Sequence, residues 1–338
     1  MIYILIPFFI ILFPPIAFFL YLTLTEYKPR DVEEGIIYRK LQDQDFNLTL
    51  SISTFNIGYC ALDKERIKIG DDIKNSKRSF RDKTFDNMVA ITDTVKSIDT
   101  DFTLLQEVDL NSSRSDNLNQ IEYITSELKS HNASFAFNYN AKFVPFPLNN
   151  PVGGTHSGLL TMSKHRFTKT ERYQLEGQEK WPKSMFFLKR CLLINEYDLP
   201  RNKKLIVINV HLSSYDKLEL FRTQQFHDML EYVSFLYDGK KNYIIIGGDF
   251  NFLMDKSKFN EDTPSWLKPL PEELFDSKFK PVFDSKVNTM INSDGFESNI
   301  DGFIVSQNIK VVKCTTLNEK FEHTNHNPVK LTFKVSNK

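Results

Sequence analysis

Polar side chains that can hold a metal ion or move a proton follow, or directly precede, the apolar stretches of this sequence. Active sites of α/β proteins are built at strand ends, so this placement predicts one shared site. Burying so many polar groups without a common purpose would cost free energy. The candidate residues are Asn56, Glu107, His211, Asp249, Asn251, Asp301 and His326.

Each candidate also has a purely structural interpretation. Glu107 at a strand end is compatible with a water-facing carboxylate, and Asp249 after two glycines is typical of a turn or a helix cap. His211 within an apolar strand resembles a core histidine, whereas Asp301 and His326 are compatible with turn residues. The functional interpretation depends on the set of residues, since no single member carries it.

Metal-assisted hydrolysis is the chemistry that such a set suits. Mg²⁺ prefers carboxylate, amide and water oxygens, and it neutralises charge on a phosphoryl oxygen and its leaving group. Histidine exchanges protons near neutral pH. The sequence contains no His-x-x-x-His or Cys-x-x-Cys spacing for zinc, no Gly-x-Ser-x-Gly and no P-loop. A magnesium- or manganese-dependent hydrolase is therefore expected.

The elements that must position these residues are read from hydrophobic periodicity. Strands outnumber helices, and helices connect only some of them, which predicts a mixed α/β architecture. Helices are expected at 85–98, 118–128 and 226–236, and strands at 48–57, 102–105, 158–162, 186–194, 205–212, 243–246, 300–305, 309–315 and 329–335. Long loops are expected at 145–154 and 254–280.

Composition excludes several classes of protein. The 338 residues carry 43 Lys plus Arg and 43 Asp plus Glu, so this is neither a polybasic nucleic-acid binder nor a disordered chain. Three cysteines cannot make a disulfide scaffold, and 12 glycines exclude collagen. The composition is that of a globular protein, and we expect a monomer.

Residues 1–25 carry no charged side chain and are long enough to cross a bilayer, which takes about 20 apolar residues. An uncleaved transmembrane helix is the preferred interpretation, although Pro7, Pro14 and Pro15 interrupt it. A cleaved signal peptide and a buried core helix are the alternatives. The signal peptide lacks its usual preceding basic residue and small-residue cleavage site.

The polar residues 26–46 are expected to form a tether to a catalytic domain at 47–338. Lys28 and Arg30 follow the apolar segment, and basic residues of this kind favour a cytoplasmic position for the part of the chain after the span. A long domain can translocate regardless of such charges, and we expect an extracytoplasmic catalytic domain.

Seven short motifs make the sequence resemble the endonuclease/exonuclease/phosphatase superfamily, and their order matches the family over residues 48–335. The family includes pancreatic-type deoxyribonucleases, abasic-site endonucleases, inositol-polyphosphate phosphatases and neutral sphingomyelinases. The motifs are TFNI at 54–57, LQEVD at 105–109, SGLLTMS at 157–163, NVHL at 209–212, GDFN at 248–251, IDGFI at 300–304 and HNPV at 326–329. The anchor followed by Glu26–Arg30 is similar to a bacterial membrane-anchored branch of the family.

The resemblance implies a two-sheet α/β sandwich flanked by helices, with the site at one edge, and in-line attack of water on phosphorus. Glu107 would be the principal metal ligand, assisted by Asn56. Asp249 would orient or deprotonate the water, and Asn251 would hold a phosphate oxygen.

Two histidines and one further aspartate complete the implied site. His211 and His326 would contact the phosphate and handle protons. Asp301 would hydrogen-bond His326 and fix its tautomer.

One position departs from the family pattern, which has Ser-Asp-His where this chain has Thr324-Asn325-His326. Asn325 keeps an oxygen but loses the charge, so metal affinity or rate is expected to fall about 10–100-fold. This departure makes a weakened enzyme or a non-catalytic binding module an alternative.

Substrate remains open between a lipid head group, a small phosphoester and nucleic acid. The membrane anchor favours lipid, and the aromatic loop 143–148 is a candidate for lipid contact. Zero net charge weighs against nucleic acid, whose binding is dominated by phosphate neutralisation. The basic cluster at 77–83 is the candidate exception, although a solvated loop explains it as well.

Overall fold

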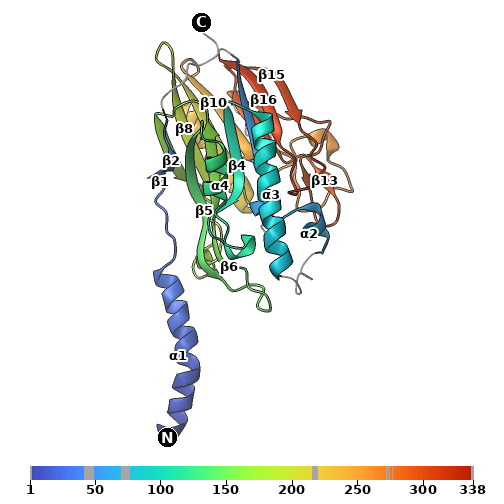
Figure 1. Ribbon diagram of the computed structural model, residues 1–338. Helices are drawn as coiled ribbons and strands as arrows, with labels where there is room; N and C mark the ends of the chain where they lie inside the picture. The colour runs from blue at the N-terminus through green and yellow to red at the C-terminus, as the bar shows by residue number, and fades with distance from the viewer. Residues whose placement is uncertain are drawn as a thin grey trace.

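The computed structural model describes residues 2–41, 49–69, 77–214, 220–271, 273, 275 and 277–335. Two seven-stranded sheets pack face to face, and helices cover their outer faces (Figure 1). In spatial order the first sheet contains β1 (Val32–Glu34), β7 (Lys169–Gln174), β8 (Cys191–Leu199), β9 (Lys203–His211), β10 (Asn242–Asp249), β14 (Asp301–Ser306) and β11 (Phe279–Val282). The second contains β15 (Ile309–Thr316), β16 (Val329–Val335), β3 (Thr49–Asn56), β4 (Phe102–Asp109), β6 (Gly153–Ser163), β5 (Asn132–Val144) and β2 (Ile36–Arg39).

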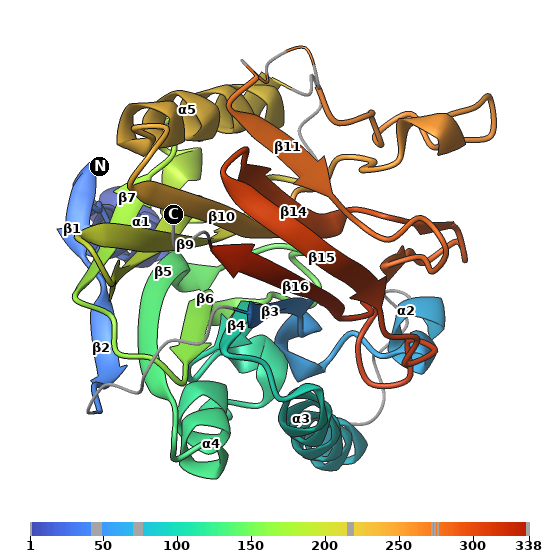
Figure 2. The same ribbon diagram turned by 90° about the horizontal axis from the view of Figure 1, so that it is seen from above.

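Short elements complete the chain. The strands β12 (Met290–Ile291) and β13 (Glu297–Ser298) form a separate pair. The helices are α1 (Ile2–Leu24), α2 (Lys64–Ile69), α3 (Lys77–Ile98), α4 (Gln120–Glu127) and α5 (Leu220–Leu236). Figure 2 shows α5 on the outer face of one sheet and α3 and α4 on the outer face of the other.

Each sheet contains one parallel strand pair joined by a helix. Strand β3 pairs with β4 through α3, and β9 pairs with β10 through α5. Two neighbouring parallel strands end at the same edge of a sheet, so each helical crossover places the carboxyl ends of its two strands side by side. The two sheets are stacked with these ends on one side of the sandwich, because Asn56 at the end of β3 bonds to Asp249 at the end of β10.

Three apolar clusters hold the layers together. The central one packs Ile52 and Leu104 of the second sheet against Val207 and Ile245 of the first. A second cluster packs α5 onto the first sheet, and a third packs α3 and α4 onto the second. The residues Tyr243–Ile246 are buried throughout because β10 has a sheet on one face and α5 on the other.

Gly247 allows the two sheets to approach closely beside the site. A Cβ atom at this position would lie 2.7 Å from side-chain carbons of both Leu104 and Phe303. The spacing of the sheets next to Asp249 therefore depends on the absence of a side chain here.

The predicted two-sheet α/β sandwich flanked by helices is confirmed, as are the three predicted helices, which are present as α3, α4 and α5. The strand predicted at 186–194 begins instead at Cys191, because a short 3-10 helix at Lys183–Met185 precedes it. Strands β5 and β7 were not predicted: aromatic residues of β5 alternate with small and polar ones, and β7 is a mostly polar strand.

The apolar N-terminal segment forms helix α1, which projects from the body of the molecule (Figure 1). Among the helices described, none combines the length and hydropathy needed to cross a membrane. The side chains of residues 1–11 lie outside the described part of the chain. Membrane anchoring therefore stays a prediction.

The segment predicted as a tether is part of the fold as far as residue 41, which corrects the domain boundary. Strand β1 pairs with β7 at the edge of one sheet, and β2 pairs with β5 at the edge of the other. Unpaired strand edges offer free N–H and C=O groups, and these two strands satisfy one edge of each sheet. Residues 42–46 of the predicted tether lie outside the described residues.

Candidate active site

Three neighbouring strands of the first sheet deliver three candidate residues in register. His211 at the end of β9 is the pairing partner of Asp249 at the end of β10. Asp249 is in turn the partner of Asp301, which begins the antiparallel strand β14. All three side chains are buried, so the sheet edge carries two carboxylates and an imidazole shielded from water.

The second sheet contributes Asn56 from β3 and Glu107 from β4. The Asn56 Nδ2 atom donates to Asp249 Oδ2 at 3.0 Å and to Glu107 Oε1 at 3.4 Å. Its Oδ1 atom accepts a hydrogen bond from the Gly58 N–H at 3.0 Å. Asn56 therefore links the carboxylates of the two sheets through its side-chain NH₂ group. Its side-chain oxygen was expected to assist metal binding, but it accepts a backbone hydrogen bond instead.

Two of the candidates have backbone conformations that few side chains adopt. Glu107 has φ of 55° and lies in a β-bulge between Leu105 and Val108, and Asn251 has φ of 53°. A β-bulge interrupts the regular alternation of side chains along a strand, and here it turns Glu107 toward His211 of the other sheet. Positive φ costs about 1–3 kcal/mol for such residues, which the surrounding fold must offset.

His326 is held by Asp301 and approaches Asp249. Its Nδ1 atom lies 2.8 Å from Asp301 Oδ2, and its Nε2 atom lies 3.8 Å from Asp249 Oδ2. Burial acts to lower the pKa of His326, but the Asp301 carboxylate outweighs it, and the pKa rises to about 9. The imidazole is therefore a cation near neutral pH.

Asp249 is the most heavily contacted carboxylate of the site. Besides Asn56, it faces His211 Nε2 at 3.4 Å. Burial and the neighbouring Asp301 charge raise the pKa of Asp249 to about 7. Burial and the Arg190 cation lower the pKa of His211 well below its usual value, so that imidazole is neutral.

The donor set fits a divalent cation. One ligand atom from each of Asp249, Asp301 and His326 lies within 4.8 Å of the other two. Within the described part of the chain, Glu107 Oε2, Asp301 Oδ1 and Asn325 Oδ1 are buried without a hydrogen-bond partner. Oxygen atoms left unsatisfied in this way suit a hard cation such as Mg²⁺ or Mn²⁺.

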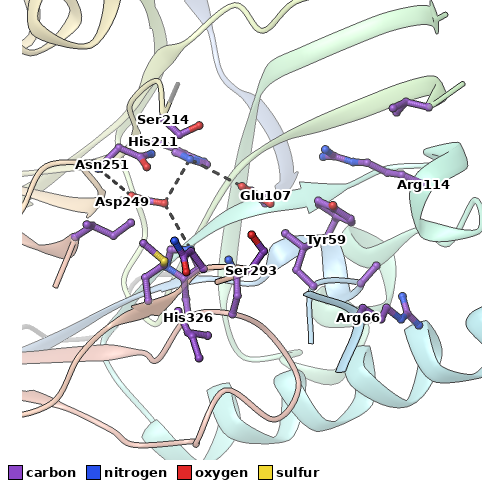
Figure 3. Close-up of a pocket in the computed structure, with 18 of the residues that line it drawn as sticks. Tyr59, Arg66, Glu107, Arg114, His211, Ser214, Asp249, Asn251, Ser293 and His326 are labelled. Carbon is purple, nitrogen blue, oxygen red and sulfur yellow. Dashed lines mark hydrogen bonds and ion pairs between the residues drawn. The ribbon is translucent and has the colours of Figure 1, made fainter. Parts of the chain in front are cut away.

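These residues lie at the bottom of an open pocket of about 750 Å³ (Figure 3). Glu107, His211, Asp249, Asn251 and His326 line it directly. Asp301 and Asn56 stand behind the lining, bonded to His326 and Asp249. The fold thus brings all seven predicted residues to one place.

The pocket wall beside Glu107 contains residues that the sequence did not predict as part of a site. Arg114 stacks on the Tyr59 ring, with its guanidinium carbon 3.9 Å from the ring centroid, and pairs with Asp109 at 2.8 Å. Arg66 lies further along the same wall and contacts Asp63 at 3.2 Å (Figure 3). A pocket of this volume has room for a molecule larger than a lone phosphate.

Arg190 is the other functional candidate that sequence reasoning missed. It precedes β8, whose antiparallel pairing with β9 places its beginning at the edge where His211 lies. The guanidinium is buried, its Nε and Nη1 atoms have no hydrogen-bond partner among the described residues, and burial lowers its pKa to about 10. Only the strand pairing reveals this position, since an arginine before an apolar run carries no signal alone.

Comparison with known proteins assigns the chain to a family. Residues 53–268 match the profile of the Endonuclease/Exonuclease/phosphatase family, and the chain belongs to this family of phosphoester hydrolases. No curated relative matches the sequence.

Solved structures share the fold at low sequence identity. An endonuclease/exonuclease/phosphatase from Beutenbergia cavernae DSM 12333 has a TM-score of 0.60 and 16% identity, covering 86% of this chain and 72% of its own. The human Nocturnin catalytic domain with bound sulfate has a TM-score of 0.57 and 14% identity, covering 85% and 94%. ANGEL2, a 2',3'-cyclic phosphatase in complex with adenosine-2',3'-vanadate, has a TM-score of 0.55 and 15% identity, covering 91% and 99%.

The contact between Asp301 and His326 is tested by the substitution Asp301→Asn. Removing the carboxylate takes away the largest influence that raises the pKa of His326, so this pKa falls from about 9 toward its ordinary value. The measurement is an NMR titration of the His326 ring protons in the metal-free protein. An unchanged pKa in the variant contradicts this assignment.

Proposed function

We propose that this protein is a divalent-metal-dependent phosphoesterase, which hydrolyses a phosphodiester or phosphomonoester by in-line attack of water. The observation that carries the proposal is the meeting of Glu107 and His326, from β4 and from the segment before β16 in one sheet, with Asp249 from the other sheet at one pocket, where Asp301 holds His326 from behind. Family membership supports it, because the family acts on phosphoester bonds.

A metal ion completes the site in this proposal. Glu107 would hold it, with the unpartnered Oδ1 atom of Asp301 supplying a further carboxylate oxygen. When bound, Mg²⁺ or Mn²⁺ neutralises the charge of the phosphoryl group.

The protein's own residues divide the proton chemistry between them. Asp249 accepts the proton of the attacking water, because a pKa of about 7 suits a general base near neutral pH. His326, with a pKa of about 9, is protonated at the same pH and donates a hydrogen bond to the phosphate. Arg190 adds a buried positive charge beside these groups.

Asn251 is held for binding rather than for proton transfer. Its Nδ2 atom donates to the Leu212 carbonyl at 2.9 Å, and its own N–H donates to Asp249 Oδ1 at 2.9 Å. One amide hydrogen of the side chain is left to contact a phosphate oxygen at the pocket, where Asn251 is a lining residue.

Membrane attachment is part of the proposal. Residues 1–25 carry no charged side chain, and Ile2–Leu24 form the helix α1, which projects from the domain (Figure 1). The catalytic domain would act outside the cytoplasm as a monomer. The Cys60 and Cys191 thiols are buried and free, so no disulfide bears on the compartment.

A membrane-attached nuclease is the second candidate, and the pocket wall argues against it. Its cations are already paired, Arg114 with Asp109 and Arg66 with Asp63, so the wall lacks the excess positive charge that a nucleic-acid backbone attracts. The basic cluster at 77–83 begins α3 rather than a loop, and Lys83 pairs there with Glu65.

The proposal is tested with DNA, RNA, sphingomyelin and inositol phosphates, each assayed with Mg²⁺ or with a chelator. We expect product release that requires the metal and falls at least about 100-fold in Glu107→Gln, which loses the charge of the principal ligand. The matched control is Glu231→Gln, which removes an exposed carboxylate of α5 and should leave the rate unchanged. Wild-type protein that is folded, binds no metal and turns over none of these substrates contradicts the proposal.

Asn325 gives a gain-of-function test. Its Oδ1 atom is buried without a partner among the described residues, and it lines the pocket beside His326. Replacing it in Asn325→Asp adds a carboxylate charge next to the metal-binding groups. The Mg²⁺ concentration for half-maximal rate should fall about tenfold, as measured by metal titration of the activity. An unchanged or increased requirement would show that position 325 does not act on the metal.

A further inference from the structure

Helix α1 leaves the domain at the same end as the turn from β5 into β6 (Figure 1), and residues of that turn line the pocket. The ring of Phe18 packs edge-on against Phe143 with centroids 5.7 Å apart, and Phe19 packs against Trp181 at 5.8 Å. Phe143 lies near the end of β5, and the turn from β5 into β6 forms one wall of the pocket. The helix and the pocket therefore share one end of the sandwich.

The junction between α1 and the domain is fixed. The Glu26 carboxylate is almost fully buried and lies 3.1 Å from Lys189 Nζ, and the Tyr27 ring contacts Phe137. Strands β1 and β2 then pair with one edge of each sheet. A buried ion pair followed by two paired strands leaves little freedom for the domain to rotate about the helix.

Exposed apolar side chains lie at this same end, on the turn from β5 into β6 and on the segment that packs against α1. We call Phe146, Leu148, Trp181 and Phe187 the apolar rim. Leu148 is 80% exposed and Trp181 57%, although side chains of this kind are usually covered. Phe146 contacts Phe186 with ring centroids 6.3 Å apart, which joins the β5–β6 turn to the segment beside α1.

The rim has the composition of a surface that meets lipid. Aromatic residues are enriched at the level of lipid head groups, and basic residues beside them pair with anionic lipid. Lys180 and Lys183 are exposed next to Trp181. The turn that carries Phe146 and Leu148 also lines the pocket through Pro147 and Pro151, so the surface and the pocket entrance are continuous.

We propose that the apolar rim rests on the bilayer and that the pocket takes its phosphoester from the head group of a lipid in that same membrane. This inference rests on the proposed function and on membrane attachment through α1. The fixed junction holds the pocket entrance toward the lipid surface, so a head group can enter without leaving the bilayer. A substrate dissolved in water has to approach the same entrance from the side.

The position of the rim is tested without any reliance on activity. Trp181 is one of only two tryptophans, so in Trp266→Phe it is the sole source of indole fluorescence. The full chain is reconstituted in phosphatidylcholine vesicles, with and without lipids brominated on the acyl chains. We expect bromine to quench Trp181. Equal emission from both kinds of vesicle overturns the inference.

The substrate class is tested in vesicles that contain the head-group phosphoesters of sphingomyelin and phosphoinositides, beside a soluble nitrophenyl phosphodiester. The double substitution Phe146→Ser with Leu148→Ser should lower lipid hydrolysis about tenfold and leave soluble hydrolysis unchanged, because only docking is weakened. The matched control is Phe235→Ser, an 87% exposed phenylalanine near the end of α5 remote from the pocket, which should change neither rate.

The two proposals fail in different ways. Turnover of the soluble ester without any turnover of vesicle lipid overturns the lipid inference and leaves the phosphoesterase in place. Equal loss of both rates in the rim variant also overturns it, since the rim would then serve the pocket rather than docking. Absence of turnover on both substrates contradicts the proposed function, and Trp181 quenching still decides whether the rim meets lipid.

Discussion

The hydrogen bond from Asn56 to Asp249 joins the two sheets at the place where chemistry is proposed. One partner ends a strand of the second sheet and the other ends a strand of the first, and their atoms lie 3.0 Å apart. Below this bond, Gln106 Nε2 donates to Asn209 Oδ1 at 2.8 Å, again between the sheets. Buried amides that bond across to the opposite sheet fix the relative position of the two layers, and the site depends on that position.

Holding the sheets in register forces like charges together. Asp249 and Asp301 are paired neighbours on adjacent strands. Glu107 faces them from the other sheet, and its backbone has a positive φ that residues with a side chain rarely adopt. The fold offsets part of this repulsion with the His326 cation and with the raised pKa of Asp249. Glu107 and Asp301 each keep an oxygen without a hydrogen-bond partner, which a metal ion would bind in the proposed function. The packing of the two sheets therefore explains both the crowding of carboxylates and the proposed metal site.

Sequence patterns predicted a mixed α/β fold and the seven residues because strand ends after apolar runs are local features, whereas the two-sheet sandwich was implied by the family resemblance. The same patterns did not predict Arg190 or the stacked pair of Arg114 and Tyr59, since their proximity to Glu107 arises from strand pairing and a tight turn. The polar and charged composition of residues 26–46 predicts a tether, but residues 32–34 and 36–39 form short strands that pair with the free edges of the two sheets. Asn56 was expected to offer its oxygen, which the Gly58 N–H binds instead.

The central claim is that water, activated at the pocket that Glu107 and Asp249 share, attacks phosphorus directly. Hydrolysis of one phosphorus stereoisomer of a phosphorothioate diester in ¹⁸O-labelled water, followed by determination of the configuration at phosphorus in the product, tests it most directly. The account predicts that one labelled oxygen enters the phosphoryl product and that the configuration is inverted. Retention of configuration, or an unlabelled phosphoryl product, would contradict it.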